Sequence, residues 1–191
     1  MLSNLIQKDL PVNPRERRII AWAAGFGAVL LIVDQITKIL AAHYLRGNHI
    51  PIIPNVFDLV YVTNKGAAWG IMQGQVWFLL AIGILVAGAA LCFMRWLTEG
   101  RTERYWALFI VLSGIVGNSI DRVWRGEVID FLDFYYRNSA GREFHFPAFN
   151  VADTAICVGL GIYFLSAILH PSGEKARKRQ EPATVPAVDH E

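Results

Sequence analysis

Long apolar runs bounded by polar residues form the dominant pattern along the chain. The clearest run, Val76 to Met94, contains no charged residue, and a helix of this length crosses about 30 Å of hydrocarbon at about 1.5 Å per residue. Three further runs reach spanning length only when polar residues at one end are included; they cover Ile19 to Leu40, Tyr105 to Ile120 and Thr154 to Leu169. The pattern predicts an all-α membrane protein with four transmembrane helices.

Two segments between these runs predict a small β-sheet. Residues 41–75 contain NVFDLVYVTNKG, which is rich in β-branched and aromatic residues and ends in the turn signal of Asn64 to Gly66. Residues 123–149 contain REFHFPAF, in which phenylalanines alternate with polar residues before a proline. We expect both loops to be extracytoplasmic and to form a β-cradle over the mouth of the helix bundle.

Lysine and arginine indicate which helix ends face the cytoplasm. They gather in residues 1–18, in the short connection after the second run and in residues 171–191, whereas residues 41–75 hold only Arg46 and Lys65. Four arginines in the third connection weaken this asymmetry. We expect both termini to be cytoplasmic, with a membrane domain at residues 19–170 and a disordered tail after it.

A cleaved signal peptide is the alternative interpretation of the first apolar run. Asp34 and Lys38 follow the apolar part of this run, and no A-x-A cleavage site appears there. Both features disfavour a signal peptide and favour a membrane helix.

Composition agrees with a membrane domain and excludes some other classes. Of the 191 residues, 54% are hydrophobic, and the formal charge of +2 is too small and too dispersed to indicate nucleic-acid binding. Cys92 and Cys157 lie in apolar runs without a CxxC motif, and we expect both to be small buried hydrophobic residues. No HExxH motif appears, and we expect no metal and no cofactor.

Polar residues interrupt three of the four runs at the same end of the predicted bundle. If both termini are cytoplasmic, three groups reach the outer leaflet: Asp34 with Lys38, Asn118 with Asp121 and Arg122, and Asn150 with Asp153. A charged side chain at the bilayer centre costs about 2.5–3.5 kcal/mol, so several at one depth indicate a shared polar cavity. We expect this cavity to open toward the outside.

Two of these groups also have a purely structural interpretation. Asp34 and Lys38 are four residues apart, and an ion pair with Lys38 reaching the lipid headgroups is an equal alternative to a role in a site. Asn150 and Asp153 have the spacing of a capping box, which by itself would explain an acid at a helix start.

Asn118, Asp121 and Arg122 share one helix face by their spacing. They can bind loop carbonyls as a structural network as well as take part directly in chemistry. Gly114 and Gly117 beside them allow close helix packing or close approach of a substrate backbone.

Asp130, in GEVIDFLDF, is the remaining candidate. Its neighbours are apolar, so an exposed loop carboxylate is disfavoured, whereas we expect Asp133 to face water. If the fold brings Asp130 and Asp153 close together in a low-dielectric pocket, the two cannot both ionise easily, and one keeps a proton. Such a pair can activate water with one carboxylate and protonate the carbonyl oxygen of a scissile peptide with the other.

Five blocks in this order resemble the motifs of bacterial lipoprotein signal peptidase, or signal peptidase II. They read DQITK (34–38), NKGAAWG (64–70), GNSIDR (117–122), VIDFLDF (128–134) and FNVAD (149–153), and the resemblance covers roughly Ala21 to Leu169. That family consists of aspartyl intramembrane proteases of the bacterial inner membrane, which remove the signal peptide from prolipoproteins just before a diacylglyceryl-modified cysteine. The resemblance implies the same hydrolase activity here, with an active site facing the periplasm and the outer leaflet.

The resemblance also implies partners and residue roles. The partners would be diacylglyceryl-modified prolipoproteins and membrane lipids, and we expect a monomer. By motif position the catalytic pair is Asp130 and Asp153, the substrate-binding residues are Asn64, Gly66, Asn118, Arg122 and Asn150, and the supporting residues are Asp34, Lys38 and Asp121. The stretch Gly66 to Gly70 resembles the family's periplasmic cradle. One departure is Ser113, which stands where the family usually has a glycine, and it removes no catalytic group.

Two other function classes are alternatives on the residues alone. A small proton-coupled transporter predicts an inverted repeat and polar groups near mid-membrane, and neither is evident in the sequence. A non-enzymatic membrane scaffold would use the polar groups to bind its helices together. In a scaffold, Asp130→Asn and Asp153→Asn would disturb assembly rather than a reaction.

Overall fold

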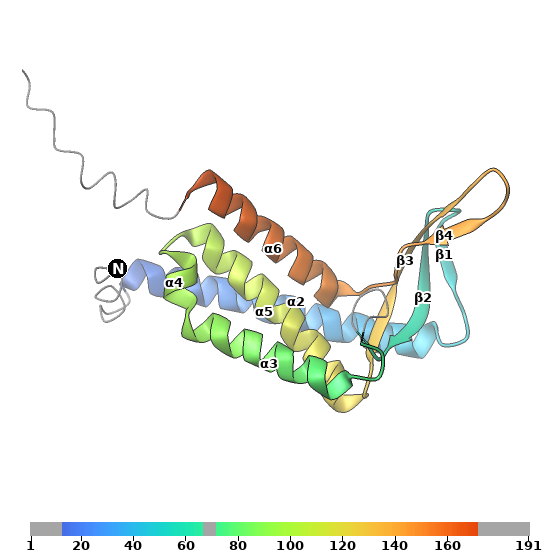
Figure 1. The fold of residues 1–191 in the computed structure, drawn as a ribbon, viewed down its shortest axis with the longest axis horizontal. Helices are drawn as coiled ribbons and strands as arrows, with labels where there is room; N and C mark the ends of the chain where they lie inside the picture. The colour runs from blue at the N-terminus through green and yellow to red at the C-terminus, as the bar shows by residue number, and fades with distance from the viewer. Residues whose placement is uncertain (1–12, 67–71, 172–191) are drawn as a thin grey trace, which may run out of the picture.

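Helices and a small sheet occupy different parts of the molecule. The computed structural model describes residues 13–66 and 72–171. In chain order the described elements are α2 (Pro14–Tyr44), β1 (Ile50–Ile53), β2 (Phe57–Asn64), α3 (Val76–Cys92), α4 (Met94–Thr98), α5 (Thr102–Trp124), β3 (Val128–Arg137), β4 (Glu143–His145) and α6 (Val151–Leu169). The long helices lie side by side, and the sheet projects from one end of them (Figure 1).

Three of the helices in the described residues are long and apolar enough to cross a membrane, namely α2, α5 and α6. The uncharged helix α3 has 17 residues, which gives a length of about 26 Å. Three of the four expected helices are therefore confirmed as long and apolar enough to span a membrane.

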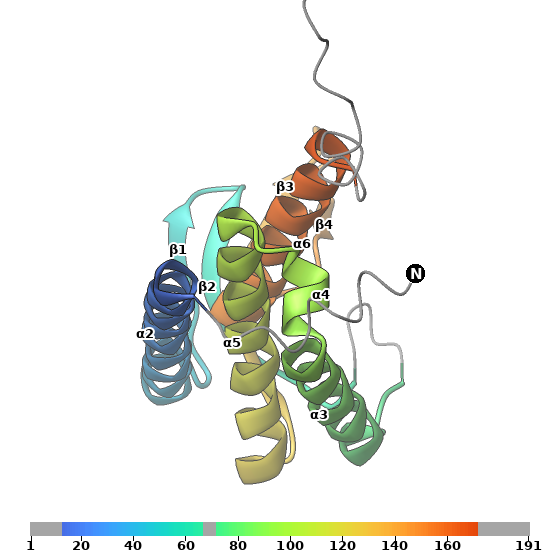
Figure 2. The same ribbon diagram turned by 90° about the vertical axis from the view of Figure 1, so that its left-hand side faces the viewer.

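Helix α5 lies at the centre of the bundle. It contacts α2, α3, α4 and α6, and Figure 2 shows it between α2 and α3. Half of the residues in the most apolar 18-residue stretch of α5 are buried inside the protein, whereas the buried share of the corresponding stretch is 17% in α2 and 22% in α6. Polar side chains on α5 are consequently covered by neighbouring helices rather than by lipid.

The two loops form one antiparallel sheet with strand order β1-β2-β3-β4, which confirms the small sheet expected from residues 41–75 and 123–149. In the register of β2 and β3, Val62 lies opposite Asp130 and Asn64 lies opposite Val128. The turn signal at Asn64 to Gly66 thus ends β2 close to the start of β3.

A hydrophobic cluster attaches the sheet to the helices. Ile129 and Phe131 of β3 pack against Ala41 and Leu45 at the end of α2. Because successive side chains of a strand point to opposite faces, Asp130 lies on the face away from this cluster. The apolar contacts therefore fix the direction of the Asp130 side chain.

Several sequence expectations concern residues outside the described part of the chain. They are most of the N-terminal segment 1–18, most of the stretch Gly66 to Gly70, and nearly all of the tail 171–191. The expectation that Cys92 and Cys157 are buried was wrong, because both are exposed. In a membrane protein, lipid solvates apolar side chains that a soluble protein would cover.

Candidate active site

Asp130 is held in β3 by two asparagines. The carboxyl is buried, with the residue 3% exposed. Its Oδ1 accepts a hydrogen bond from Asn150 Nδ2 at 2.7 Å, and its Oδ2 accepts one from Asn64 Nδ2 at 3.3 Å. These donors come from the start of α6 and the end of β2, so three elements meet at this carboxyl.

Asp153 lies in the first turn of α6. Its backbone N–H donates to Asn150 Oδ1 at 2.9 Å, and its Oδ2 accepts from the Asn150 backbone N–H at 3.2 Å, so the capping box is confirmed. The other oxygen, Oδ1, accepts from Asn118 Nδ2 at 2.7 Å. The cap thus holds this carboxylate at a fixed position beside α5.

Asn150 joins the two carboxylates. It is fully buried, its side-chain amide contacts Asp130 and its backbone N–H contacts Asp153. The structural and the chemical interpretations of this helix start are therefore compatible, because the residue that caps α6 also brings Asp130 and Asp153 into one site.

The electrostatics of Asp130 follow from this burial. Loss of hydration raises the pKa of the Asp130 carboxyl to about 7, and the charge of Asp153 acts in the same direction. The hydrogen bonds from Asn64 and Asn150 act in the opposite direction. A carboxyl that titrates near neutral pH can exchange a proton during a reaction.

Lys38 lies at the centre of a buried ionic network. Its Nζ is 2.9 Å from Asp34 Oδ2 and 3.1 Å from Asp121 Oδ2, and it donates to Asn118 Oδ1 at 2.9 Å. The ion pair between Asp34 and Lys38, one of the two alternatives for these residues, is present. The idea that Lys38 reaches the headgroups is wrong, because Lys38 is fully buried and is satisfied by a carboxylate of α5.

Asp34 and Asp121 each tie this network to a second element. Asp34 Oδ1 accepts from the backbone N–H of Ala152, in the first turn of α6, at 2.8 Å. Asp121 Oδ2 accepts from the backbone N–H of Ile129 at 3.3 Å, and Arg125 also pairs with Asp121. Ile129 and Ala152 are the neighbours of Asp130 and Asp153 in the sequence. The ionic network therefore fixes the position of the backbone beside both carboxylates.

Arg122 and Gly66 meet at the edge of the same site. Arg122 Nη2 donates to the carbonyl of Gly66 at 3.3 Å, and the N–H of Gly66 donates to Asn64 Oδ1 at 2.9 Å. The structure therefore links by hydrogen bonds and ion pairs all ten residues singled out from the sequence.

Asp133 was misjudged from the sequence. It is 8% exposed rather than facing water, and its Oδ2 lies 2.9 Å from Nδ1 of His145. Partial burial acts to lower the pKa of His145, but the Asp133 carboxylate outweighs it and the pKa is raised. The pair borders a groove of about 500 Å³ that Val62 and Phe146 also line. The alternating REFHF stretch at residues 142–146 predicted part of the small sheet, but it did not show that His145 pairs with Asp133.

Within residues 13–66 and 72–171, no group of three or more His, Cys, Asp or Glu side chains is arranged to hold a metal ion. The polar site consists of carboxylates, amides, guanidinium groups and the ammonium of Lys38, and its carboxylates accept hydrogen bonds or pair with cations. Such a site is suited to proton transfer.

Comparisons with known proteins point in one direction. The family model described as Signal peptidase (SPase) II matches residues 26–169. The lipoprotein signal peptidase of Brevibacillus brevis is 42% identical over 158 residues, covering 82% of this chain and 99% of that protein. The lipoprotein signal peptidase of Halalkalibacterium halodurans is 39% identical over 153 residues, covering 78% and 94%.

Solved structures agree with the sequence relatives. One bacterial membrane enzyme superposes with a TM-score of 0.71 at 28% identity and covers 86% of this chain and 95% of its own. A second has a TM-score of 0.66 at 31% identity, with coverages of 80% and 95%.

The apolar helices and the buried carboxylate site define a membrane-embedded enzyme. The chain belongs to the signal peptidase II family and is a protease. The transporter and the scaffold alternatives are therefore set aside.

Proposed function

We propose that this protein is an aspartyl endopeptidase that cleaves prolipoproteins immediately before the diacylglyceryl-modified cysteine. Membership of the signal peptidase II family supports the cleavage of prolipoprotein signal peptides. The observation that carries the aspartyl mechanism is the bridging by Asn150, which contacts Asp130 and Asp153 from two different elements in a buried site.

The chemistry needs one shared proton. The ionised carboxylate of the pair takes a proton from water, and the oxygen of that water attacks the scissile carbonyl carbon. The protonated partner donates its proton to the carbonyl oxygen, which gives a neutral tetrahedral diol. Collapse of the diol transfers a proton to the leaving amine and regenerates a pair with one proton. The raised pKa of Asp130, about 7, supports a pair of carboxyls that shares one proton at neutral pH.

Substrate backbone would bind to the amides and the guanidinium around the pair. Asn64, Gly66 and Arg122 lie at the edge of the site, while Asn118 and Asn150 lie between the carboxylates and the ionic network. In this assignment Asp34, Lys38 and Asp121 position these residues without contacting substrate.

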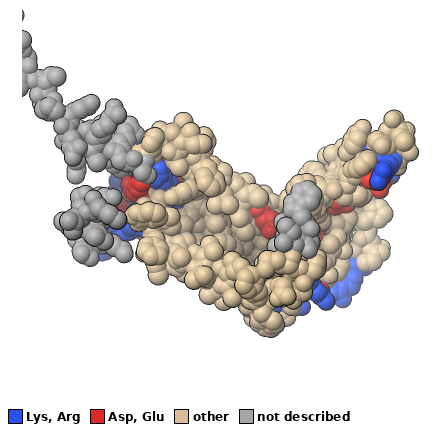
Figure 3. Space-filling model, viewed as in Figure 1, with Lys and Arg blue, Asp and Glu red and all other residues tan. Residues whose placement is uncertain are grey.

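We also propose that α3 is a fourth span and that both termini are cytoplasmic. Residues 1–18 and 171–191 would then flank a membrane domain at 19–170, and the site would open at the outer leaflet of the bacterial cytoplasmic membrane. On the face in Figure 3, the side chains of Lys, Arg, Asp and Glu gather toward the two ends of the molecule, with a broad uncharged zone over the helices. This distribution supports a helix bundle that crosses the bilayer.

The test is cleavage of a purified diacylglyceryl-modified prolipoprotein in detergent, followed as a gel shift. Asp130→Asn and Asp153→Asn each remove one ionisable group, and we expect about a 10²–10⁴-fold loss of rate. Asp58→Asn is the matched control, because Asp58 lies in the same sheet and its carboxylate accepts a hydrogen bond from the Tyr135 hydroxyl, outside the polar site.

Unlipidated precursor should not be cleaved by any variant. Folding is checked by the melting temperature of each protein. If either Asp130→Asn or Asp153→Asn retained the parent's rate, the aspartyl pair would be the wrong assignment.

A further inference from the structure

Asn118 of α5 lies between the ionic network and the proposed catalytic pair. Its side chain is buried. Its Oδ1 accepts a hydrogen bond from Lys38 Nζ at 2.9 Å, and its Nδ2 donates one to Asp153 Oδ1 at 2.7 Å. One side chain therefore connects the ammonium of α2 to a carboxylate of α6.

Lys38 fixes the direction of the Asn118 amide. An ammonium group donates hydrogen bonds and accepts none, whereas an asparagine side chain accepts at its oxygen and donates at its nitrogen. Because Lys38 holds Oδ1, the nitrogen end of Asn118 faces Asp153. Asn150 favours the same direction, since its Nδ2 also donates to Asn118 Oδ1, at 3.2 Å. The carboxylate of Asp153 thus receives an N–H donor, which stabilises its ionised form.

Asp130 receives its corresponding donor from an asparagine at the edge of the site. Asn64 ends β2 and is partly exposed, and its Nδ2 lies 3.3 Å from Asp130 Oδ2. This bond is longer than the 2.7 Å bond from Asn118 to Asp153, so it stabilises a negative charge less.

The surroundings of the two carboxyls differ in the same sense. Asp130 is 3% exposed and belongs to a strand, whereas Asp153 is partly exposed and belongs to the first turn of α6. Partial hydration and the start of a helix both favour the ionised form. Burial raises the pKa of Asp130 to about 7, so Asp130 is the member that holds a proton near neutral pH.

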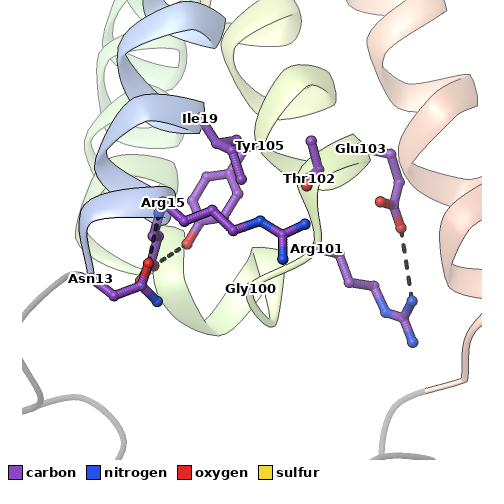
Figure 4. Close-up of a pocket in the computed structure, with 9 residues that line it drawn as sticks. Asn13, Arg15, Ile19, Gly100, Arg101, Thr102, Glu103 and Tyr105 are labelled. Carbon is purple, nitrogen blue, oxygen red and sulfur yellow. Dashed lines mark hydrogen bonds and ion pairs between the residues drawn. The ribbon is translucent and has the colours of Figure 1, made fainter.

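Nearby charges act on both members of the pair. The charged groups around it belong to α2 and α5 and are Asp34, Lys38, Asp121, Arg122 and Arg125. Lys38 acts electrostatically on both carboxyls, and so does Arg122. The ion pair of Arg101 with Glu103 lies at the other end of α5 (Figure 4), roughly 24 Å from Asn118 along the helix axis. The difference between the two carboxyls therefore comes from hydrogen bonds, burial and the helix start.

We propose that Asn118, held in one orientation by Lys38, assigns the roles within the pair: Asp153 is the ionised carboxylate that takes a proton from water, and Asp130 holds the proton that passes to the scissile carbonyl oxygen. When the resulting diol collapses, Asp153 gives its proton to the leaving amine as the C–N bond breaks, and Asp130 recovers a proton from a diol hydroxyl. Asn118 is a positioning residue in this scheme, because it acts through Asp153. The assignment rests on the proposed aspartyl mechanism.

The test is the pH dependence of kcat/KM for the full-length protein in detergent, with a diacylglyceryl-modified prolipoprotein as substrate. The acid limb of this profile reports the essential base, and the alkaline limb reports the essential acid. Asn118→Ala removes a donor from Asp153 and should move the acid limb up by about one pH unit. Asn64→Ala removes a donor from Asp130 and should move the alkaline limb up instead. The rate at the optimum can fall in both variants, so the positions of the limbs decide.

The matched control is Asn138→Ala. The Asn138 side chain also accepts backbone hydrogen bonds, from Ala140 and Arg142, but it lies in the turn between β3 and β4. This variant should keep both limbs of the parent. An acid limb moved by Asn64→Ala and an alkaline limb moved by Asn118→Ala would overturn the proposal, because Asp130 would then be the base. Limbs unmoved by both variants would overturn it as well.

Asn118→Asp keeps the test decisive if Asn118→Ala does not fold. A carboxylate at position 118 still accepts the bond from Lys38 but offers no N–H to Asp153, so the acid limb should move up by at least about one pH unit. Failure of the proposed function is a separate result. If Asp130→Asn and Asp153→Asn abolish cleavage while the limbs stay in place, the aspartyl pair is kept and only the assignment of roles fails. Parent-like cleavage by either of those variants would refute the pair itself.

Discussion

At the scale of single residues, the same side chain serves folding and the proposed chemistry. Asp153 returns the hydrogen bond of the α6 cap, and it also accepts from Asn118 of α5. An asparagine at position 153 can still accept the bond from the Asn150 N–H through its Oδ1. Asp153→Asn should therefore preserve the helix start while it removes the ionisable group.

The raised pKa of Asp130 predicts a pH dependence of stability. The folded protein titrates this carboxyl near pH 7, whereas the ordinary value is 3.8, so folding takes up a proton between about pH 4 and pH 7. The stabilisation is fully present below about pH 4 and is lost as pH rises through about 7. Each unit of pKa difference corresponds to about 1.4 kcal/mol.

Asp130→Asn removes this proton uptake. Between pH 5 and pH 8, the melting temperature of the parent in detergent should fall more than that of Asp130→Asn, as measured by differential scanning fluorimetry. Asp58→Asn should keep the parent's slope. Identical slopes for the parent and Asp130→Asn would contradict the buried, protonated form of this carboxyl.

Removal of Lys38 should destabilise the fold strongly. Lys38→Met leaves Asp34 and Asp121 buried and without their ammonium partner, and loss of one member of a buried ionic group costs about 3–5 kcal/mol. The matched control is Lys65→Met, whose side chain is 62% exposed and lies 3.9 Å from Glu127; such surface pairs contribute about 0–1 kcal/mol. Denaturant or thermal unfolding of both variants measures the difference, and equal losses would show that the ionic network does not stabilise the helices.

At the scale of elements, the separation of α5 and α6 determines the site. Gly114 on α5 faces Ala152 and Ile156 of α6, and a Cβ added to Gly114 would overlap the Ala152 carbonyl oxygen and lie 2.7 Å from Ile156 Cγ1. The backbones therefore approach closely only because position 114 has no side chain. This approach places Asn118, one turn further on, within 2.7 Å of Asp153.

Gly114→Ala should lower both stability and activity. Forcing the helices apart costs about 1–3 kcal/mol, and a displacement of about 1 Å at the Asp pair can cost about 10²-fold in rate. Gly88→Ala in α3 is the control, because a Cβ at Gly88 meets nothing within 4 Å. Cleavage rates and melting temperatures of the two variants distinguish the effect; a Gly114→Ala protein with unchanged activity would show that this packing does not position the site.

The sequence predicted the positions of the helices better than it predicted which side chains contact one another. Apolar runs located the four helices, but α2 extends from Pro14 to Tyr44, beyond the predicted Ile19 to Leu40, because helical hydrogen bonds continue into polar surroundings that hydropathy excludes. Local spacing predicted the pair of Asp34 with Lys38. Lys38 pairs with Asp121 of another helix, and Asp133 pairs with His145 across the β3–β4 pair, so neither partner can be predicted from one segment.

At the scale of the whole molecule, one bundle carries a polar cluster at each end. The carboxylate site lies where the sheet meets the helices, and a group of arginine and glutamate side chains lies at the start of α2 and α5: Arg15, Glu16, Arg101 and Glu103. Between them the exposed side chains of the helices are largely apolar. This arrangement supports the proposed orientation in a bilayer, because each polar end requires its own aqueous surface.

The crossing of α3 decides this orientation and can be measured directly. Asn48 follows α2 and Thr102 begins α5, so α3 is the spanning candidate between them, and both positions are exposed. Single cysteines replace Asn48, Thr102 or Ser139 in a background of Cys92→Ala with Cys157→Ala, because both native cysteines are exposed.

An impermeant maleimide is then added to right-side-out membrane vesicles. Asn48→Cys and Ser139→Cys should be labelled at once, and Thr102→Cys only after permeabilisation. The 17 residues of α3 reach about 26 Å, which a bilayer accommodates by slight local thinning. Labelling of Asn48→Cys and Thr102→Cys from the same side would show that α3 does not cross the membrane, and the protein would have three spans.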